Sequence, residues 1–289
     1  MGAPYAEVIG DPIAHSKSPP IHKFWLGKLG IEGDYRAHRL RVGEMRAYFA
    51  ARRADPDWRG CNVTMPLKPA ALWHPDFIDK GSHLARASNC IAWDRGRLFG
   101  FNTDISGIAA CLEPLLTSLK SEGHGDLYLE ASVIGAGGAA RAAAIALERE
   151  FPRVAMSFYN RTPAKAEAMS QEFRGHPDNG FGLDRLRGYP ERQGSYLVVA
   201  ILINATPMGM EGHAPVPVDL ATYGERTIVY DLVYHPVETP LLRDARARGL
   251  RTISGLEMLV EQAARAFELF FGRPAPRGYD AELMERLTR

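Results

Sequence analysis

Several features that would mark particular classes of protein are missing from this chain of 289 residues. Its three cysteines, Cys61, Cys90 and Cys111, have no metal-ligand spacing and cannot all pair. We therefore expect reduced thiols in a cytoplasmic protein. None of the nine histidines forms a pair with the spacing of a zinc motif, so no metal site is predicted.

The chain also lacks a strong charge of either sign and a long apolar run. Its formal net charge is +1, without a basic tail, so neither nucleic acid nor an acidic membrane is an expected partner. The longest apolar run, residues 196–203, is too short to cross a bilayer and is typical of a buried strand. The length of 289 residues suits one large domain or two of moderate size, and a hydrophobic content of 46% is ordinary for a globular protein.

A glycine-rich stretch stands out in the middle of the chain. A short apolar run over 131–134 leads into Gly135 and Gly137, and an alanine-rich helical pattern follows over 139–150. In a dinucleotide site, Gly135 would make the tight turn, and Gly137 would let the backbone approach a pyrophosphate at the helix N-terminus. On these residues alone, an ordinary strand-turn-helix without a ligand stays an alternative.

The end of the next predicted strand, 153–159, indicates which dinucleotide would bind. An NAD site usually carries Asp or Glu there, to bind the ribose 2′-hydroxyl. This chain has Arg161 and Lys165 instead. Two cations suit a 2′-phosphate, and an arginine can contact it with a fork of N–H groups. The sequence therefore predicts NADP (NADPH) as the cofactor in preference to NAD.

The predicted elements alternate between strand and helix along the chain. Nearly apolar strands over 196–204, 227–231 and 251–253 indicate a parallel sheet covered on both faces. We predict an α/β protein with two domains and the active site in the cleft between them. The first is a substrate-binding and catalytic domain over 1–104, joined by the C-terminal helices over 255–289. The second, over 105–254, is a Rossmann-like doubly wound NADP-binding domain.

Four local predictions concern polar residues at helices. Ser18 is expected to cap a helix with Pro19 in its first turn, whereas Ser16 could help to hold a polyol or a carboxylate. Pro66 is expected to open another helix, which places Lys68 in its first turn, where the helix dipole disfavours a cation. A solvated surface lysine is the alternative explanation for Lys68. Asn102, Thr103 or Asp104 could cap the helix over 105–119, and Glu261 with Arg265 is predicted to form a surface ion pair.

Eight short motifs occur in an order that resembles the shikimate dehydrogenase family over essentially the whole chain. They are residues 10–19, 62–68, 100–107, the loop beginning at Gly135, 160–162, 204–210, 230–236 and 255–262.

The resemblance implies the reversible NADPH-dependent reduction of 3-dehydroshikimate to shikimate, a step of aromatic amino acid biosynthesis, by a monomer or homodimer. It implies a catalytic pair, Lys68 and Asp104. The implied substrate-binding residues are Ser16, Ser18, Asn62, Thr64, Asn89, Tyr234 and Gln262. The implied cofactor-binding residues are Gly135, Ala136, Gly137, Gly138, Ala139, Asn160, Arg161, Thr162, Lys165, Thr206, Leu232 and Gly255.

The chain departs from the family pattern at a few positions, namely Lys23, Ser88, Cys90, His235, Glu257 and Glu261. Glu257 stands where the family usually has Gly, and it places a charge where the last long helix should approach the cofactor or the substrate ring. A quinate/shikimate or aminoshikimate-type dehydrogenase is therefore an alternative, as is a non-catalytic ligand-sensing homologue. The presence of both Lys68 and Asp104 argues against a sensor, which has no need of that pair.

Overall fold

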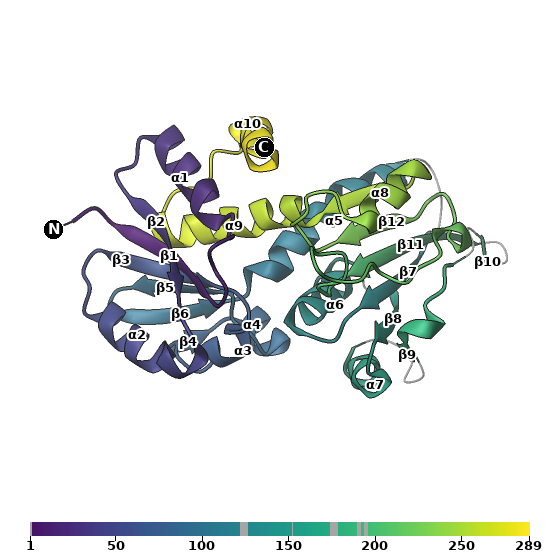
Figure 1. Ribbon diagram of the computed structural model, residues 1–289, viewed down its shortest axis with the longest axis horizontal. Coiled ribbons are helices and arrows are strands. Elements are labelled where there is room, and N and C mark those ends of the chain that lie inside the picture. The colour runs from purple at the N-terminus through teal and green to yellow at the C-terminus, as the bar shows by residue number, and fades with distance from the viewer. Residues whose placement is uncertain (1, 122–126, 152, 174–178, 190–191, 194–195) are drawn as a thin grey trace. The chain divides into compact units, whose positions relative to one another are not determined.

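The computed structural model describes residues 2–121, 127–151, 153–173, 179–189, 192–193 and 196–289 (Figure 1). The chain divides into two compact units, the first formed by 1–103 with 260–289 and the second by 104–259. Two helices carry the chain from one unit to the other, α5 (Thr103–Ser121) and α9 (Gly255–Phe271). No helix in the described part of the chain is long and apolar enough to cross a membrane.

A mixed sheet of six strands, ordered β2-β1-β3-β5-β6-β4, forms the centre of the first unit. The strands are β1 (Tyr5–Gly10), β2 (Asp34–Arg39), β3 (Trp58–Val63), β4 (Phe77–Ile78), β5 (Cys90–Asp94) and β6 (Arg97–Phe101). β1 is parallel to both of its neighbours, whereas β5 is antiparallel to β3 and β6. The carboxyl ends of β1 and β3 therefore meet at one edge of this sheet.

Side-chain alternation divides the core of the first unit between the two faces of this sheet. Cys61 and Val63 of β3 pack with Ile9 of β1 in one apolar cluster, so Asn62 points to the opposite face. The helices of this unit are α1 (Ser18–Leu29), α2 (Met45–Arg53), α3 (Lys68–Ala71), α4 (Lys80–Ala85), α10 (Asp280–Thr288) and most of α9.

The second unit contains a sheet in the order β13-β12-β11-β7-β8-β9, with all of these strands parallel and β10 pairing with β11. The strands are β7 (Leu127–Ile134), β8 (Ala155–Asn160), β9 (Gly180–Gly182), β10 (Arg192–Gln193), β11 (Tyr196–Asn204), β12 (Ile228–Asp231) and β13 (Arg251–Ser254). The helices α6 (Gly138–Glu150), α7 (Pro163–Glu172) and α8 (Pro240–Ala247) pack against it.

This strand order confirms the predicted doubly wound fold. Read from β9 to β13, the sheet has the 3-2-1-4-5-6 order of a dinucleotide-binding domain, with β7 as its first strand. The order reverses between β7 and β11. In such sheets ligands bind at the carboxyl ends of the strands beside that reversal. The glycine turn after β7 lies at this position.

Two of the predicted helix starts are wrong. α1 begins at Ser18 itself, Lys17 occupies the cap position, and no side chain caps the helix there. Instead, the Ser16 hydroxyl accepts a hydrogen bond from the Ser18 amide at 3.3 Å, which closes a turn before the helix. α3 begins at Lys68, so Pro66 lies in the preceding turn, in which the Leu67 amide donates to the Thr64 carbonyl.

The predicted ion pair between Glu261 and Arg265 is also wrong. Arg265 contacts Glu268 one turn further along α9. Glu261 pairs with Arg277, which offers it two N–H groups from the C-terminal segment. A forked contact with a guanidinium is more favourable than a single contact along the helix surface. The local sequence pattern does not predict this pair because 16 residues separate Glu261 from Arg277.

Candidate active site

A hydrogen-bonded cluster of polar side chains is buried in the first unit. Its members come from strands and helices far apart in the sequence: Tyr35, Asn62, Asn89, Thr103 and Gln262. Each is at most 5% exposed. Three of them, Asn62, Asn89 and Gln262, are predicted substrate-binding residues, so the structure brings these three together.

Asn89 is the centre of this cluster. Its Oδ1 accepts a hydrogen bond from the Thr103 amide at 2.6 Å, and its Nδ2 donates to Thr103 Oγ1 at 3.0 Å. The Thr103 hydroxyl donates in turn to Gln262 Oε1 at 3.1 Å. Thr103 therefore connects Asn89, which directly precedes β5, to the long helix α9. These hydrogen bonds also hold the start of α5, because Thr103 is its first residue.

Sequence reasoning missed two members of the cluster. Thr103 appeared only as a candidate cap for the helix that follows it. Tyr35 lies on β2, and nothing in the local sequence pattern distinguishes an aromatic residue of the core from one that binds a polar partner. In the structure the Tyr35 hydroxyl donates to Asn62 Oδ1 at 2.6 Å. The signal was absent because 27 residues separate these two positions.

Ser16, Ser18 and Thr64 lie at the carboxyl edge of the same sheet. The first two follow β1 and the third follows β3, and the backbone joins the starts of the two loops. The Thr64 amide donates to the Ile9 carbonyl at 2.9 Å. Ser18 is buried, whereas Ser16 and Thr64 are half-buried. Hydroxyls at this edge are suited to an anionic or hydroxylated ligand.

Lys68 is tied to the cluster through the backbone. Its carbonyl accepts a hydrogen bond from the Ser88 amide at 3.1 Å, and Asn89 is the next residue. The half-buried Lys68 begins α3, which has only four residues, so the unfavourable helix dipole expected there is small. Asp104, 5% exposed, directly follows Thr103 and is the first residue of the second unit.

The glycine turn of the second unit fits a dinucleotide. Gly135 has a φ of 120°, and a Cβ there would lie 3.0 Å from the Ala205 carbonyl oxygen, so only glycine suits this close approach. A Cβ at Gly137 would meet open space. α6 begins at Gly138, and the first amides of a helix have no partner within it, so they can bind phosphate.

The predicted 2′-phosphate residues lie at the carboxyl end of β8. Asn160 Oδ1 accepts a hydrogen bond from the Thr162 amide at 2.9 Å, which shapes the turn into α7. Arg161, Thr162 and Lys165 are exposed. A cation at the end of the strand and another in the first turn of the helix are therefore accessible to an anionic ligand.

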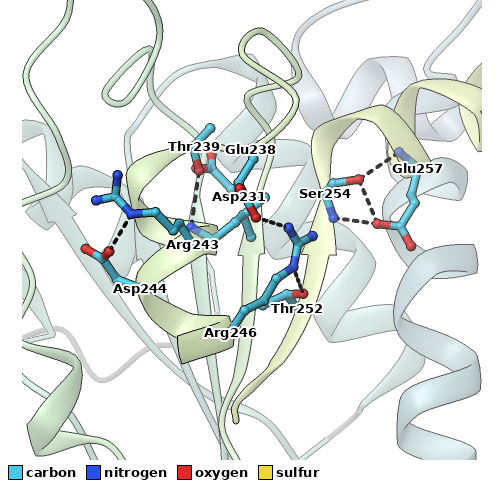
Figure 2. A network of polar contacts seen from close by, with 10 residues as sticks. Asp231, Glu238, Thr239, Arg243, Asp244, Arg246, Thr252, Ser254 and Glu257 are labelled. Carbon is cyan, nitrogen blue, oxygen red and sulfur yellow. Dashed lines mark hydrogen bonds and ion pairs between the residues drawn. The ribbon is translucent and has the colours of Figure 1, made fainter. Parts of the chain in front are cut away.

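Asn204 positions two more of the predicted cofactor residues. Its Oδ1 accepts hydrogen bonds from the Thr206 amide and hydroxyl, at 3.1 and 2.6 Å. Its backbone carbonyl accepts from the Leu232 amide at 3.0 Å. The Asn204 side chain also donates to the buried carboxylate of Asp231 at 2.9 Å. That carboxylate accepts a further hydrogen bond from Thr239 at 2.6 Å (Figure 2). Burial raises the pKa of Asp231.

Gly255 and Tyr234 complete the predicted set in the second unit. A Cβ at Gly255 would lie 2.5 Å from the Leu232 carbonyl oxygen, so the start of α9 approaches the backbone after β12 closely. Tyr234 is half-buried, and burial raises the pKa of its phenol, so it stays protonated at neutral pH.

The strand order and the glycine turn define a dinucleotide-binding α/β protein. Residues 8–91 match the shikimate dehydrogenase substrate binding domain, and residues 255–285 match the shikimate 5′-dehydrogenase C-terminal domain. The shikimate dehydrogenase (NADP(+)) of Sphingopyxis alaskensis is 45% identical, over 99% of this chain and 97% of its own length. The chain belongs to the shikimate dehydrogenase family, as its motifs predict.

Solved structures agree with this assignment. Shikimate 5-dehydrogenase from Thermus thermophilus, in complex with NADP(H) and shikimate, has a TM-score of 0.78 at 36% identity, over 98% of this chain and 99% of that one. A 5-ketofructose reductase from a Gluconobacter strain, in its ligand-free form, has a TM-score of 0.81 at 27% identity, over 99% of each chain. The fold is thus shared with a protein named for a different substrate.

Proposed function

We propose that this protein catalyses the reversible reduction of 3-dehydroshikimate to shikimate with NADPH. The observation that carries the proposal is the buried cluster of Asn62, Asn89 and Gln262, with Lys68 tied beside it through the Ser88 amide. Amide groups both donate and accept hydrogen bonds, as ring hydroxyls do, and their orientation is fixed here by hydrogen bonds within the protein. The family of the chain supports this substrate.

The polar residues of the first unit divide between two parts of the substrate. Ser16 and Ser18 would hold the carboxylate, and the ring hydroxyls would be bound by Asn62, Thr64, Asn89 and Gln262, with Tyr234 beside the ring. The position of Ser18 supports its role, because it is the buried first residue of α1 at the carboxyl edge of the sheet.

The cofactor-binding residues would be those around the glycine turn and at the strand ends of the second unit. When bound, NADPH supplies the hydride. The backbone from Gly135 to Ala139 would hold the pyrophosphate, and Asn160, Arg161, Thr162 and Lys165 would hold the 2′-phosphate. Thr206, Leu232 and Gly255 would line the path toward the nicotinamide, and the fixed loop after Asn204 supports that role.

Lys68 and Asp104 would carry the chemistry. Hydride addition to a ketone leaves negative charge on the oxygen, and the Lys68 ammonium would stabilise that charge and donate the proton. The Asp104 carboxylate would orient the ammonium and accept a hydrogen bond from a substrate hydroxyl. Its position directly after Thr103 supports this role, because Thr103 is fixed to Asn89 by two hydrogen bonds.

The wider organisation belongs to the same proposal. Residues 1–104 with 255–289 would form the substrate-binding and catalytic domain, and 105–254 the NADP-binding domain. We further propose that the protein acts in the cytoplasm as a monomer or homodimer, with small molecules as its binding partners.

The test is NADPH oxidation measured by absorbance with 3-dehydroshikimate as substrate. The same assay is run in the reverse direction with shikimate, quinate and an aminoshikimate, and a parallel assay uses 5-ketofructose. We expect the highest kcat/KM with 3-dehydroshikimate and NADPH. No turnover of 3-dehydroshikimate, or a higher kcat/KM with 5-ketofructose in the reductive direction, would refute the proposal. In the oxidative direction, a higher kcat/KM with quinate or the aminoshikimate than with shikimate would also refute it. Shikimate binding without any turnover would instead indicate a sensor.

A further inference from the structure

We infer that Tyr35 is a positioning residue for the substrate: its hydroxyl fixes the side-chain amide of Asn62 so that Nδ2 is presented as a hydrogen-bond donor. The inference rests on the proposed function, in which Asn62 binds a ring hydroxyl. Tyr35 itself would not touch the substrate.

The two residues meet across a strand. Tyr35 lies on β2 and Asn62 on β3, with β1 between them. The residue of β1 in register with Tyr35 is Ala6, which is also in register with Gly60 of β3. Because these two residues have little or no side chain, the phenol can extend over β1 to reach Asn62 Oδ1 at 2.6 Å.

A second hydrogen bond of the Asn62 side chain sets the orientation of its amide. Asn62 Nδ2 lies 3.4 Å from the Asn89 backbone carbonyl, which can only accept a hydrogen bond. If the amide were turned over, Oδ1 would face that carbonyl and the two oxygens would repel each other. The carbonyl thus sets which way the amide faces, and the Tyr35 hydroxyl, which can donate to Oδ1, holds it in that orientation. One N–H of Nδ2 is then left for a ligand.

The phenol of Tyr35 is itself held firmly. It stacks on the ring of His22, with centroids 3.9 Å apart and planes inclined by 6°, and Phe270 packs at 6.4 Å. Tyr35 is fully buried, and burial raises the pKa of its phenol, so the hydroxyl stays a donor. The stack leaves the ring little freedom to release Asn62.

Tyr35→Phe tests the inference because it removes one oxygen and keeps the ring on His22. We expect the Kd for shikimate, measured by calorimetry, to rise roughly 5- to 30-fold, as for the loss of one buried hydrogen bond. The Kd for NADP should not change. Tyr48→Phe is the matched control, since this buried phenol of the same unit donates to Glu7 at 2.7 Å on another part of the sheet. It should leave both Kd values unchanged.

Shikimate analogues that each lack one ring hydroxyl separate a specific effect on Asn62 from a general loss of stability. A general loss of stability would weaken the binding of every analogue alike. For the analogue without the hydroxyl that Asn62 binds, wild type and Tyr35→Phe should bind equally well. Equal binding of shikimate itself by wild type and Tyr35→Phe would overturn the inference, as would an equal loss of affinity in Tyr48→Phe. If the wild-type protein does not bind shikimate, the proposed function fails, and the inference fails with it.

Discussion

The carboxylate of Glu257 accepts hydrogen bonds from both the amide and the hydroxyl of Ser254, each at 2.7 Å (Figure 2). The Glu257 amide lies 3.3 Å from the same hydroxyl, so the two residues form a reciprocal capping box at the start of α9. The charge that is unexpected in the sequence therefore has a local structural role, and its carboxylate is turned back onto Ser254.

Glu257→Ala should lower stability more than activity. Loss of the capping box is expected to reduce the free energy of unfolding by about 1 kcal/mol, measured by denaturant unfolding. The KM for NADPH should stay within about twofold of the wild-type value, since a change of a few tenths of a kcal/mol is the most we expect there. A large rise in this KM with unchanged stability would show that Glu257 acts on the cofactor instead.

Gly255→Ala should disturb the approach of α9 to the loop after β12. The new Cβ would lie 2.5 Å from the Leu232 carbonyl oxygen, so one of the two backbones must shift. We expect a loss of roughly 1–3 kcal/mol in stability, together with a higher Kd for NADPH. Gly278→Ala is the control, because a Cβ there meets open space. Equal effects of the two substitutions would contradict this explanation.

Arg161→Ala should separate the two nicotinamide cofactors. Loss of a charge-assisted contact to the 2′-phosphate is expected to raise the KM for NADPH about 10- to 100-fold and to leave the KM for NADH nearly unchanged. Arg153→Ala, which removes an exposed arginine before the other end of β8, serves as the control. If Arg161→Ala affects both cofactors equally, the assignment of the 2′-phosphate site is wrong.

His22 should make stability depend on pH. Burial lowers its pKa from 6.5 to about 3, so between these values the unfolded chain binds a proton that the folded protein excludes. The stability that neutral His22 contributes is fully present above the pKa of this residue in the unfolded chain. It is lost as the pH falls below that value. From about pH 6.5 to pH 5 this loss is about 2 kcal/mol.

His22→Phe checks this dependence by denaturant unfolding at several pH values. The variant keeps a ring against Tyr35 and should show a smaller decline in stability over that pH range. His15→Phe, at an exposed position of the chain, should decline as the wild type does. Parallel curves for wild type and His22→Phe would contradict the prediction.

The sequence predicted the second unit well, because its signals are local. Apolar strands, the turn at Gly135 and the basic strand end at Arg161 each lie within a few residues, and parallel strands joined by helices allow few topologies. The predicted strand over 196–204 coincides with β11. Motif order then indicated the family, which no single motif could have done.

What the sequence did not reveal depends on contacts between distant residues. The hydrogen bond from Tyr35 to Asn62 and the pairing of Glu261 with Arg277 require the folded chain. At Ser18 the local rule itself failed, because Ser16 closes the turn one step earlier. At Glu257 a local pattern is present, because Ser254 stands three residues before it, as a capping box requires, and this pattern explains the charge without a ligand.

Lys68→Ala tests the central claim most directly. Lys80→Ala is its matched control, since Lys80 also begins a short helix of the first unit. In NADPH-dependent reduction of 3-dehydroshikimate, we expect Lys68→Ala to lower kcat by a factor on the order of 10²–10⁴ while the Kd for NADPH and the melting temperature stay unchanged. Lys80→Ala should retain full activity. A near-normal kcat in Lys68→Ala would contradict the account.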